Sequence, residues 1–419
     1  LILLLLSTFT TALNYVIYAD EWHPALPNNS LPSSTASRVT HVNLAFAHSN
    51  NTPPFTPKYP LSTYRANFPS AKLSVAIGGW GDTIGFSKAV ADGDVGIETW
   101  AKNVGELVKQ SGYDGIDIDW EYPGGNGADY LEVSNERKVA EIAAFPVLLK
   151  KVKEVIGRDK VLSIAVPGKK EDMIAFTNET VRGIWEAVDM VNVMAYDLIN
   201  RRDKVTAHHS SVEGAERAVR NYLDLGAPAE KVNLGFAWYA KYFATQGDCG
   251  GSALGCAIEE AENPVTGEDT LTSGAYTFEM GNMKVIDGAS LPISYDGTCG
   301  AEAGKRCATG CCSQYGMCGV SKEHCSGACQ YAFGTGCTGK DVAGSWQLAA
   351  KHGVEAGGQY YFDAQNRLFW TWDTPATISR KFKDIVRRHN LGGVMAWSLG
   401  EDSFDWSHVK GLADGVEAL

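Results

Sequence analysis

The chain has 419 residues, of which 44% are hydrophobic and 21% charged, and its formal net charge at pH 7 is −12. This composition supplies enough apolar side chains for a large core and excludes a chain that is mainly disordered. No run of Lys or Arg forms a basic stripe, so we expect no nucleic-acid partner, and a neutral or cationic substrate fits better than a polyanion.

The first twelve residues, LILLLLSTFTTA, are similar to the apolar and small-residue parts of a secretory signal peptide. They are too short to span a bilayer, and Thr10 and Ala12 suit cleavage after Ala12. An N-terminal strand or core segment is the alternative. Three Asn-X-Ser/Thr sequons, at Asn28, Asn50 and Asn178, are compatible with secretion. We therefore expect a secreted protein, extracellular or cell-wall associated, with no membrane partner.

Eight short β-like runs follow, most of them nearly continuous in apolar residues, as strands buried on both faces are. They cover residues 15–19, 41–47, 72–79, 115–121, 161–168, 190–197, 232–240 and 392–400. Helical patterns separate many of them, at 95–112, 136–157, 215–226 and 375–392. We expect Gly112 to end the first of these helices and Pro146 to interrupt or kink the second. The alternation predicts an α/β fold, a (β/α)8 TIM barrel.

The long gap between the seventh and eighth strands breaks this alternation, because about 150 residues exceed any ordinary loop. We therefore expect inserted domains there. The sequence divides into a barrel at 13–240 and 361–419, a small α+β insertion after strand 7 at 241–298 and 339–360, and a disulfide-rich block at 299–338.

All ten cysteines lie in this gap, and eight of them crowd between Cys299 and Cys337. A cytosolic enzyme could use such a cluster for metal, but the spacing has no paired C-x2-C knuckles and includes the adjacent Cys311 and Cys312. Together with the leader-like start, this favours a disulfide framework. We expect neither a metal site nor a cofactor.

The predicted strand GIDIDWE carries three carboxyl groups at alternate positions. Because side chains alternate faces along a strand, Asp117, Asp119 and Glu121 share one face and the apolar residues between them share the other. The apolar set suits the helix layer, so the acids should point into the barrel. Burying three unpaired carboxylates costs too much for structural filler, and like charges at this range force at least one to hold a proton. Glu121 comes last, at the end of the strand where barrel enzymes carry out their chemistry.

A solvated acidic hairpin or a calcium site is the alternative interpretation of this strand. A calcium loop favours a flexible turn that contains glycine, however, rather than interleaved Ile, Ile and Trp. The pattern therefore indicates a catalytic strand.

The stretch DGIDIDWE resembles the D-x-x-D-x-D-x-E signature of glycoside hydrolase family 18, the family of many chitinases, with Asp114 as its first acid. AIGGW resembles the third-strand motif S-x-G-G of the family, and VMAYDL resembles the M-x-Y-D motif after the sixth strand. NLGFAWYAKYF resembles the seventh-strand motif, with Lys241 where Arg is frequent. GGVMAWSLGEDSFDW resembles the last strand. The resemblance covers nearly the whole chain from about residue 14, apart from the cysteine block. One departure is Ala76, where the family usually has a Ser that helps to hold the inner aspartate.

This resemblance implies hydrolysis of β-1,4-linked N-acetylglucosamine polymers (chitin) by a retaining, substrate-assisted mechanism. Glu121 would be the general acid and base, Asp119 would orient the acetamido group of the sugar, and Asp117 would share a proton with Asp119. Tyr196 would bind the acetamido oxygen, and Asp197 would contact the sugar or the catalytic acid. The expected partners are chitin or chito-oligosaccharides, bound by a monomer.

Aromatic side chains are the expected platforms for pyranose rings, and the chain has 11 Trp, 17 Tyr and 15 Phe. Trp397, in the last-strand motif, would form the floor of the site. Core packing is the alternative role for Trp397, Tyr18, Phe46 and Trp80. Arg201 and Arg202, after the sixth-strand motif, either reach the cleft or face solvent. The expected substrate-binding residues are Trp397, Trp80, Tyr18, Phe46, Met194 and Tyr122.

The block CGAEAGKRCATGCCSQYGMCGVSKEHCSGACQYAFGTGC resembles the hevein-like chitin-binding module, in which a CC pair precedes S-Q-aromatic-G-x-C. Sequence alone leaves the pairing of eight cysteines open. By resemblance the disulfides are Cys299–Cys312, Cys307–Cys318, Cys311–Cys325 and Cys329–Cys337, with Cys249–Cys256 as a separate bridge. Ser313, Tyr315 and His324 occupy expected sugar-binding positions, but Met317 and His324 stand where aromatic residues are usual, so two of the three stacking platforms are weakened. A decayed module kept as a spacer is the alternative.

Three other functions share parts of this pattern: a chitin lectin on an inactive barrel, an endo-N-acetylglucosaminidase of N-glycan cores, and a toxin-like delivery protein. The presence of Glu121 argues against the lectin, and the cysteine block argues against the N-glycan enzyme. Nothing in the sequence supplies the further subunit that a toxin needs. The leading hypothesis is a secreted chitinase, and the two modules together suggest a fungal source by resemblance.

Overall fold

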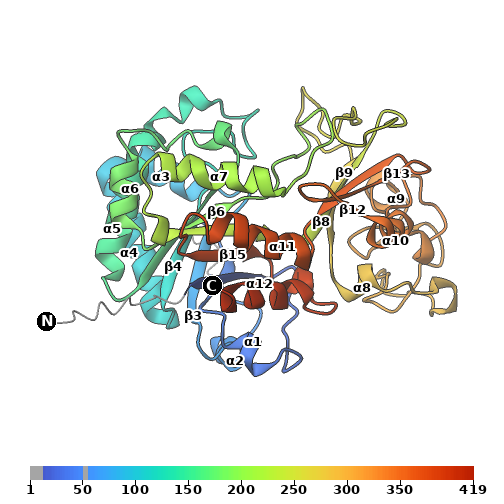
Figure 1. Ribbon diagram of the computed structural model, residues 1–419, viewed down its shortest axis with the longest axis horizontal. Coiled ribbons are helices and arrows are strands. Elements are labelled where there is room, and N and C mark those ends of the chain that lie inside the picture. The colour runs from blue at the N-terminus through green and yellow to red at the C-terminus, as the bar shows by residue number, and fades with distance from the viewer. Residues whose placement is uncertain (1–12, 51–54) are drawn as a thin grey trace, which may run out of the picture.

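A closed barrel of eight parallel strands forms the larger part of the molecule (Figure 1). The computed structural model describes residues 13–50 and 55–419, so the expected leader at 1–12 lies outside the described residues. The strand order around the barrel is β1-β15-β7-β6-β5-β4-β3-β2. The strands are β1 (Asn14–Asp20), β2 (His41–Ala47), β3 (Lys72–Gly78), β4 (Gly115–Asp119), β5 (Val161–Pro167), β6 (Met190–Met194), β7 (Val232–Ala237) and β15 (Gly393–Trp397). The predicted TIM-barrel class is confirmed.

Helices surround the barrel, and two of them differ from the sequence prediction. They are α1 (Ser33–Ala36), α2 (Leu61–Asn67), α3 (Ile84–Ala91), α4 (Gly93–Ser111), α5 (Val139–Ile156), α6 (Val181–Ala187), α7 (Val212–Asp224), α11 (Pro375–Lys381) and α12 (Ser407–Glu417). Gly112 ends α4 with a φ of 76°, a left-handed conformation that glycine adopts without steric cost. α5 continues through Pro146, because its remaining hydrogen bonds and its buried apolar face hold the helix together. The predicted helix at 375–392 instead changes to a π-helical turn at Phe382–Val386.

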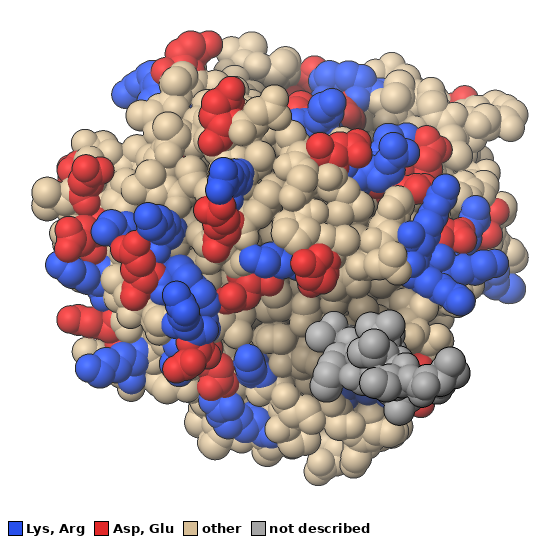
Figure 2. All heavy atoms as spheres, turned by 60° about the vertical axis from the view of Figure 1, so that its left-hand side comes forward, with Lys and Arg blue, Asp and Glu red and all other residues tan. Residues whose placement is uncertain are grey.

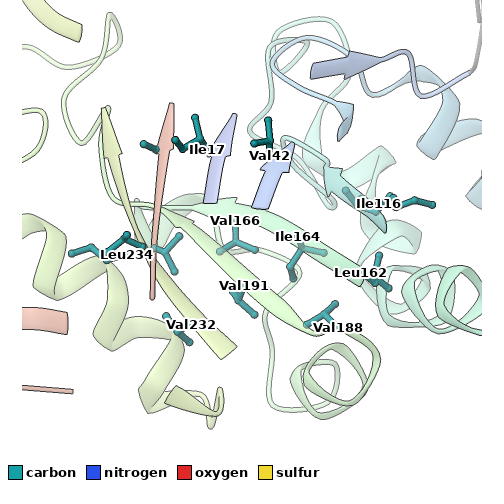
Figure 3. Packing of buried hydrophobic residues seen from close by; sticks show 14 of the residues in the cluster. Ile17, Val42, Ile116, Leu162, Ile164, Val166, Val188, Val191, Val232 and Leu234 are labelled. Atoms are coloured by element: carbon teal, nitrogen blue, oxygen red, sulfur yellow. The ribbon is translucent and has the colours of Figure 1, made fainter. Parts of the chain in front are cut away.

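The main hydrophobic core lies between the strands and the surrounding helices. In Figure 3, Ile17, Val42, Ile116, Leu162 and Leu234 belong to this outer layer. Alternate residues of the same strands, among them Val16, Tyr18, Ala76 and Met395, form a separate cluster inside the barrel. This alternation decides which side chains of each strand can reach the barrel interior.

A second, antiparallel sheet forms the insertion beside the barrel (Figure 1). Its order is β12-β13-β14-β8-β9. The strands are β8 (Tyr239–Ala244), β9 (Ser273–Thr277), β12 (Val354–Glu355), β13 (Gln359–Asp363) and β14 (Leu368–Trp372), and the helices are α8 (Met280–Met283) and α10 (Val342–His352). Trp346 of α10 and Trp370 of β14 lie in the separate core of this sheet.

The insertion is longer than the sequence predicted. Its first strand begins at Tyr239 rather than at 241, and its sheet continues to Trp372, so the predicted return to the barrel at 361 is too early. The reason is that the apolar run of β14 pairs antiparallel with β8, from Leu368 opposite Ala244 to Thr371 opposite Lys241. An apolar run by itself does not show in which of two sheets the strand will pair.

Five disulfides hold the cysteine-rich part of the chain. They join Cys249 to Cys256, Cys299 to Cys312, Cys307 to Cys318, Cys311 to Cys325 and Cys329 to Cys337, which are the pairs that the hevein-like resemblance implies. Regular structure in the block is short: β10 (Cys311–Cys312), β11 (Cys318–Gly319) and α9 (Lys322–Cys325). Buried sulfur atoms and Phe333 form its small core. A unit of this size depends on its covalent links for stability.

The surface carries both signs of charge. Figure 2 shows Lys and Arg side chains interspersed with Asp and Glu on the face in view. Throughout residues 13–50 and 55–419, no helix has the length and apolarity needed to cross a membrane.

One buried ion pair joins the insertion to the barrel helices. The Lys381 Nζ atom of α11 donates to Asp373, directly after β14, at 2.5 Å, and both side chains are fully buried. Asp373 also accepts a hydrogen bond from the Thr377 hydroxyl at 2.7 Å. Breaking a buried pair by removing one partner leaves an uncompensated charge, which is far costlier than losing a surface pair.

We predict that Lys381→Ala lowers the free energy of unfolding by about 3–5 kcal/mol, measured by urea denaturation. The matched control is Lys88→Ala, which removes a surface pair with Asp92 and should cost less than about 1 kcal/mol. Equal losses for the two variants would contradict a structural role for the Lys381–Asp373 pair.

Candidate active site

Asp117 and Asp119 point into the barrel from β4, as the alternation in the sequence predicts. Both side chains are buried, and the apolar residues Ile116 and Ile118, which alternate with them along the strand, belong to the outer core. Glu121 differs slightly from the prediction, because β4 ends at Asp119 and Glu121 lies in the segment that follows. Its side chain is still only 9% exposed. The three carboxyl groups thus run from the barrel interior to its carboxyl-terminal end.

Asp117 is held by hydrogen bonds from three strands. Its carboxylate accepts from the Tyr18 hydroxyl at 2.6 Å, the Ser163 hydroxyl at 2.5 Å and the Asn192 amide at 3.2 Å. Ala76 pairs with Asp117 across the β3–β4 ladder and offers no donor. Ser163 stands opposite Asp117 on the other neighbouring strand, β5, and supplies a hydroxyl there.

Burial dominates the proton affinity of all three carboxyl groups. It raises the pKa of Asp117 to about 6, against the opposing effect of its hydrogen bonds. Burial and the nearby carboxyls of Glu121 and Asp117 raise the pKa of Asp119 well above its ordinary value. Burial also raises the pKa of Glu121 to about 7. At neutral pH these three carboxyl groups together therefore retain protons that isolated, solvent-exposed carboxylates would have lost.

One oxygen of Asp119 has no hydrogen-bond partner among the described residues. This Oδ1 atom is buried, and Asp119 is one of the residues that line a large cleft. A buried polar atom without a partner costs free energy. Asp119 is therefore prepared to bind a polar group of a ligand.

Asp114, the first acid of the signature, does not belong to this cluster. Its carboxylate accepts a hydrogen bond from the Leu73 amide at 2.9 Å and forms an ion pair with Arg65 at 3.0 Å. Asp114 precedes β4 and therefore lies at the opposite end of the barrel from Glu121. Its contacts link the starts of β3 and β4.

Tyr196 and Asp197 follow β6 and line the same cleft. Asp197 accepts from the Tyr239 hydroxyl at 2.8 Å and lies 3.1 Å from the Lys241 ammonium. The Asp197 side chain is half-buried, and although its partial desolvation raises the pKa, the Lys241 charge lowers the pKa of Asp197 below its ordinary range, so Asp197 is ionised. This negative charge in turn contributes to the raised pKa of Glu121.

Aromatic rings line the cleft in two groups. The Trp397 ring stacks on Phe46 at 5.4 Å, with Tyr18 at 5.8 Å, and Phe46 also lies 6.4 Å from the exposed Trp22. In the second group, Trp80 lies 6.4 Å from Tyr122. Met194 also lines the cleft. All six predicted substrate-binding side chains thus face one cavity, and Trp22 joins them.

The paired glycines of AIGGW allow these groups to approach one another. Gly78 and Gly79 have φ values of 107° and 89°. A Cβ atom on Gly78 would lie 2.1 Å from the carbonyl oxygen of Asp119, and one on Gly79 would lie 2.7 Å from the Phe46 ring. Only glycine allows the end of β3 to approach both the Asp119 backbone and the Phe46 ring this closely.

The cleft has a volume of about 890 Å³, at the large end of the range for ligand pockets. Besides the predicted residues, its lining includes Tyr239, Asp172 and Asn126. Asn126 donates to Asp172 at 3.1 Å, and burial raises the pKa of Asp172. Asn126 and Asp172 could not be predicted because they lie in a loop and a short turn without a periodic pattern, and Tyr239 lies in a strand whose membership of the second sheet the sequence does not reveal. Ser163 and Asn192 could have been found as polar residues at inward positions of otherwise apolar strands.

Arg201 and Arg202 line the cleft instead of facing solvent. Both contact Glu262, a buried residue of the insertion. The alternative of a plain solvent-facing pair is therefore wrong.

The predicted binding positions of the cysteine block have different environments. Tyr315 is 79% exposed, and the Met317 side chain is also exposed. Ser313 is buried, and its hydroxyl accepts from the Met317 amide at 3.2 Å. The His324 ring is half-buried and contacts the Ser321 hydroxyl at 2.8 Å. Tyr315 is therefore the one of the three predicted positions that is widely open to a ligand.

Comparison with known proteins identifies the family. The sequence profile described as glycosyl hydrolases family 18 matches residues 14–402. The chain belongs to this family. It is 28% identical over 275 residues to Chitotriosidase-1 of Mus musculus, covering 60% of this chain and 55% of the relative. It is 23% identical to Chitinase 63 of Streptomyces plicatus over 452 residues, which cover 96% of this chain and 59% of the relative. The family 18 chain thus spans only a little over half the length of these curated relatives.

Solved structures share the fold. A group II chitinase catalytic domain of Ostrinia furnacalis matches with a TM-score of 0.65 and 18% identity, covering 97% of each chain. A family 18 N-acetylglucosaminidase of Paenibacillus barengoltzii matches with a TM-score of 0.63 and 19% identity, covering 96% of this family 18 chain and 99% of the other. Identities this low relate the folds alone.

We predict that Asp119→Asn raises the thermal midpoint at pH 7 by about 2 °C. The pKa of Asp119 is raised in the folded state, whereas an aspartate in the unfolded chain has a pKa of about 4. As the pH rises above about 4 the unfolded chain loses this proton first, so the free energy of unfolding falls. Asparagine does not ionise and escapes this loss. Thermal unfolding of both proteins between pH 4 and pH 7 measures the difference, which should disappear towards pH 4. A difference independent of pH would contradict the raised pKa of Asp119.

Proposed function

We propose that this family 18 chain hydrolyses β-1,4-linked N-acetylglucosamine polymers, with retention of configuration and with assistance from the acetamido group of the substrate. The observation that carries the proposal is the pair formed by Glu121, whose pKa is raised to about 7, and the buried Asp119, which has an unpartnered oxygen. A general acid and base works best when its pKa lies near the working pH. Family 18 enzymes are exceptions to the scheme of two enzyme carboxylates, because the substrate supplies the nucleophile.

In the first step, the acetamido oxygen attacks the anomeric carbon while the glycosidic C–O bond breaks. Glu121 donates its proton to the leaving oxygen, and a cyclic oxazolinium ion forms on the sugar. In the second step, the Glu121 carboxylate removes a proton from water, which attacks the anomeric carbon and reopens the ring. Glu121 ends protonated, ready for the next cycle.

Asp119 orients the acetamido group and stabilises the positive charge that develops on it. Asp117, held by Tyr18 and Ser163, shares a proton with Asp119 and lets its charge change during the cycle. Tyr196, directly before the ionised Asp197, hydrogen-bonds the acetamido oxygen. Asp197 keeps the proton affinity of Glu121 high through its negative charge.

The aromatic groups supply the platform for the sugar chain. Trp397 forms the floor, with Tyr18 and Phe46 as a wall, and Trp80 and Tyr122 form a second platform next to Glu121. Sugar rings present CH faces that pack on such rings. A mutant of a plant class V chitinase from Cycas revoluta, which matches this chain with a TM-score of 0.58 and 20% identity over 96% of this chain and 99% of its own, is known in complex with (GlcNAc)3.

The cysteine block is proposed as a chitin anchor, with Tyr315 as its exposed ring. A disulfide framework of this kind suits a secreted, extracellular or wall-associated protein. We propose that the protein acts as a monomer.

We predict that Glu121→Gln lowers the turnover of soluble chito-oligosaccharides at least about 100-fold while binding remains, because the amide keeps the shape of the side chain but transfers no proton. Initial rates measure the first effect and calorimetric titration with an oligosaccharide measures the second. Near-normal turnover in this variant would exclude Glu121 as the acid.

The same assay separates the neighbouring functions when a glycoprotein is offered beside chito-oligosaccharides. A lectin would bind the oligosaccharides without cleaving them, and an N-glycan enzyme would cleave the glycoprotein faster. Asp119→Asn should lose most activity towards the oligosaccharides and keep its fold. A normal rate in that variant would mean that the reaction proceeds without acetamido assistance.

For the cysteine block, we predict that Tyr315→Ala, made in the full chain, reduces retention on solid chitin about threefold or more, because a stacking platform for a sugar is lost. Its turnover of soluble oligosaccharides should stay unchanged. Tyr295→Ala is a matched control, since Tyr295 is 97% exposed just outside the block. Unchanged retention in the Tyr315 variant would favour a spacer without a binding function.

A further inference from the structure

Three asparagine side chains form a chain of hydrogen bonds through the barrel interior. The Asn14 amide of β1 donates to the Oδ1 atom of Asn233 of β7 at 3.3 Å, and Asn233 donates to the Oδ1 atom of Asn192 of β6 at 2.9 Å. Asn192 in turn donates to the Oδ1 atom of Asp117 at 3.2 Å. Asn192 and Asn233 are fully buried, whereas Asn14 is half-buried at the start of its strand. The chain therefore links the amino-terminal end of the barrel to Asp117.

Strand register brings the three asparagines within reach of one another. Asn192 stands opposite Asn233 in the ladder of β6 and β7, and Gly393 of β15 stands opposite both Asn233 and Asn14. Leu234, the next residue of β7, belongs to the outer core, so Asn233 points inward. Because Gly393 has no side chain, nothing from β15 separates the Asn14 and Asn233 amides at this level of the barrel.

The bonds fix the direction of each amide. A side-chain amide donates from its NH2 group and accepts at its oxygen. If the Asn192 amide turned over, its NH2 group would face the NH2 group of Asn233, and its oxygen would face the Asp117 carboxylate. Asn233 is kept from turning in the same way, because its oxygen accepts from Asn14. The chain thus ends with a donor on Asp117.

We propose that Asn233 is a positioning residue for the reaction: it fixes the Asn192 amide so that a donor, and not an acceptor, meets Asp117. A donor stabilises the ionised carboxylate, whereas an oxygen at the same place would require Asp117 to keep a proton. The inference rests on the proposed function, in which Asp117 shares a proton with Asp119. Asn233 does not line the cleft, so it acts through Asn192.

Few other groups influence the proton on Asp117. Tyr18 of β1 and Asp119 of β4 are the titratable side chains that the described part of the chain places against it, and the residues opposite it on β3 and β5 do not titrate. Burial raises the pKa of Asp117 to about 6, and the hydrogen bonds from Ser163, Tyr18 and Asn192 oppose this rise. An Asn192 amide that is free to turn would therefore raise the proton affinity of Asp117.

The test measures kcat/KM for a soluble chito-oligosaccharide from pH 4 to pH 9 in wild type and in Asn233→Leu. Leucine forms no hydrogen bond, so the Asn192 amide can turn to accept from Asp117 whenever Asp117 is protonated. The acidic limb of the profile reports groups of the free enzyme that must lose a proton. We expect this limb to move up by about half a pH unit, the size of one hydrogen-bond preference.

Asn14→Ala removes only the bond that orients Asn233 and should move the acidic limb in the same direction by less. Because Asn14 is half-buried, this variant also carries the test if Asn233→Leu does not fold. Ser74→Ala is the matched control, since Ser74 is a fully buried residue of β3 whose hydroxyl has no hydrogen-bond partner among the described residues. Its profile should match that of wild type.

A double-mutant cycle tests whether Asn233 acts through Asn192. In an Asn192→Leu background, Asn233→Leu should cause no further shift of the acidic limb. A full shift in that background would overturn the inference, because Asn233 would then act by another route. An unmoved limb in the single variant would also overturn it, and a lower kcat at every pH would then indicate a general structural role. The proposed function would stand in these cases, whereas a wild-type protein that cleaves no chito-oligosaccharide would overturn both.

Discussion

The structure depends on the burial of three carboxyl groups at one end of a single strand. Removing a charge from water is costly, so each of these groups must either hold a proton or find donors. Asp117 finds donors on β1, β5 and β6, whereas Asp119 holds a proton against the charges on either side of it. The closed barrel makes both solutions possible, because its strands bring side chains from distant parts of the sequence around one axis. The same burial gives Glu121 a pKa suited to chemistry near neutral pH.

The insertion completes the site from outside the barrel. Tyr239 and Lys241 of β8 hold Asp197 ionised, and β8 starts only two residues after β7 ends. Glu262 lies farther along the insertion and binds the arginines that follow β6. The fold therefore uses the connection between its last two barrel strands both to set the charge beside Glu121 and to fix one wall of the cleft. The residues that form the cleft therefore come from both the barrel and the insertion.

Much of the site could be predicted from the sequence because it depends on strand periodicity. The alternation in GIDIDWE placed Asp117 and Asp119 inside the barrel, and the motif residues Tyr196 and Trp397 line the same cleft. Ser163 was missed although it is a polar residue at an inward position, since strand pairing decides that it stands opposite Asp117. The extent of the insertion was misjudged at β14 for a related reason, because an apolar run is compatible with either sheet.

The sequence by itself determined the barrel class, the inward direction of the acids and the chemical type of the site, because these follow from local periodicity and short motifs. Only the tertiary structure decided which donor replaces the hydroxyl that Ala76 lacks, that Asp114 serves the opposite end of the barrel, and that the arginines after β6 bind Glu262. Each of these facts is a contact between residues far apart in the chain. Such contacts depend on strand order and on the packing of the insertion against the barrel, and a linear pattern carries neither.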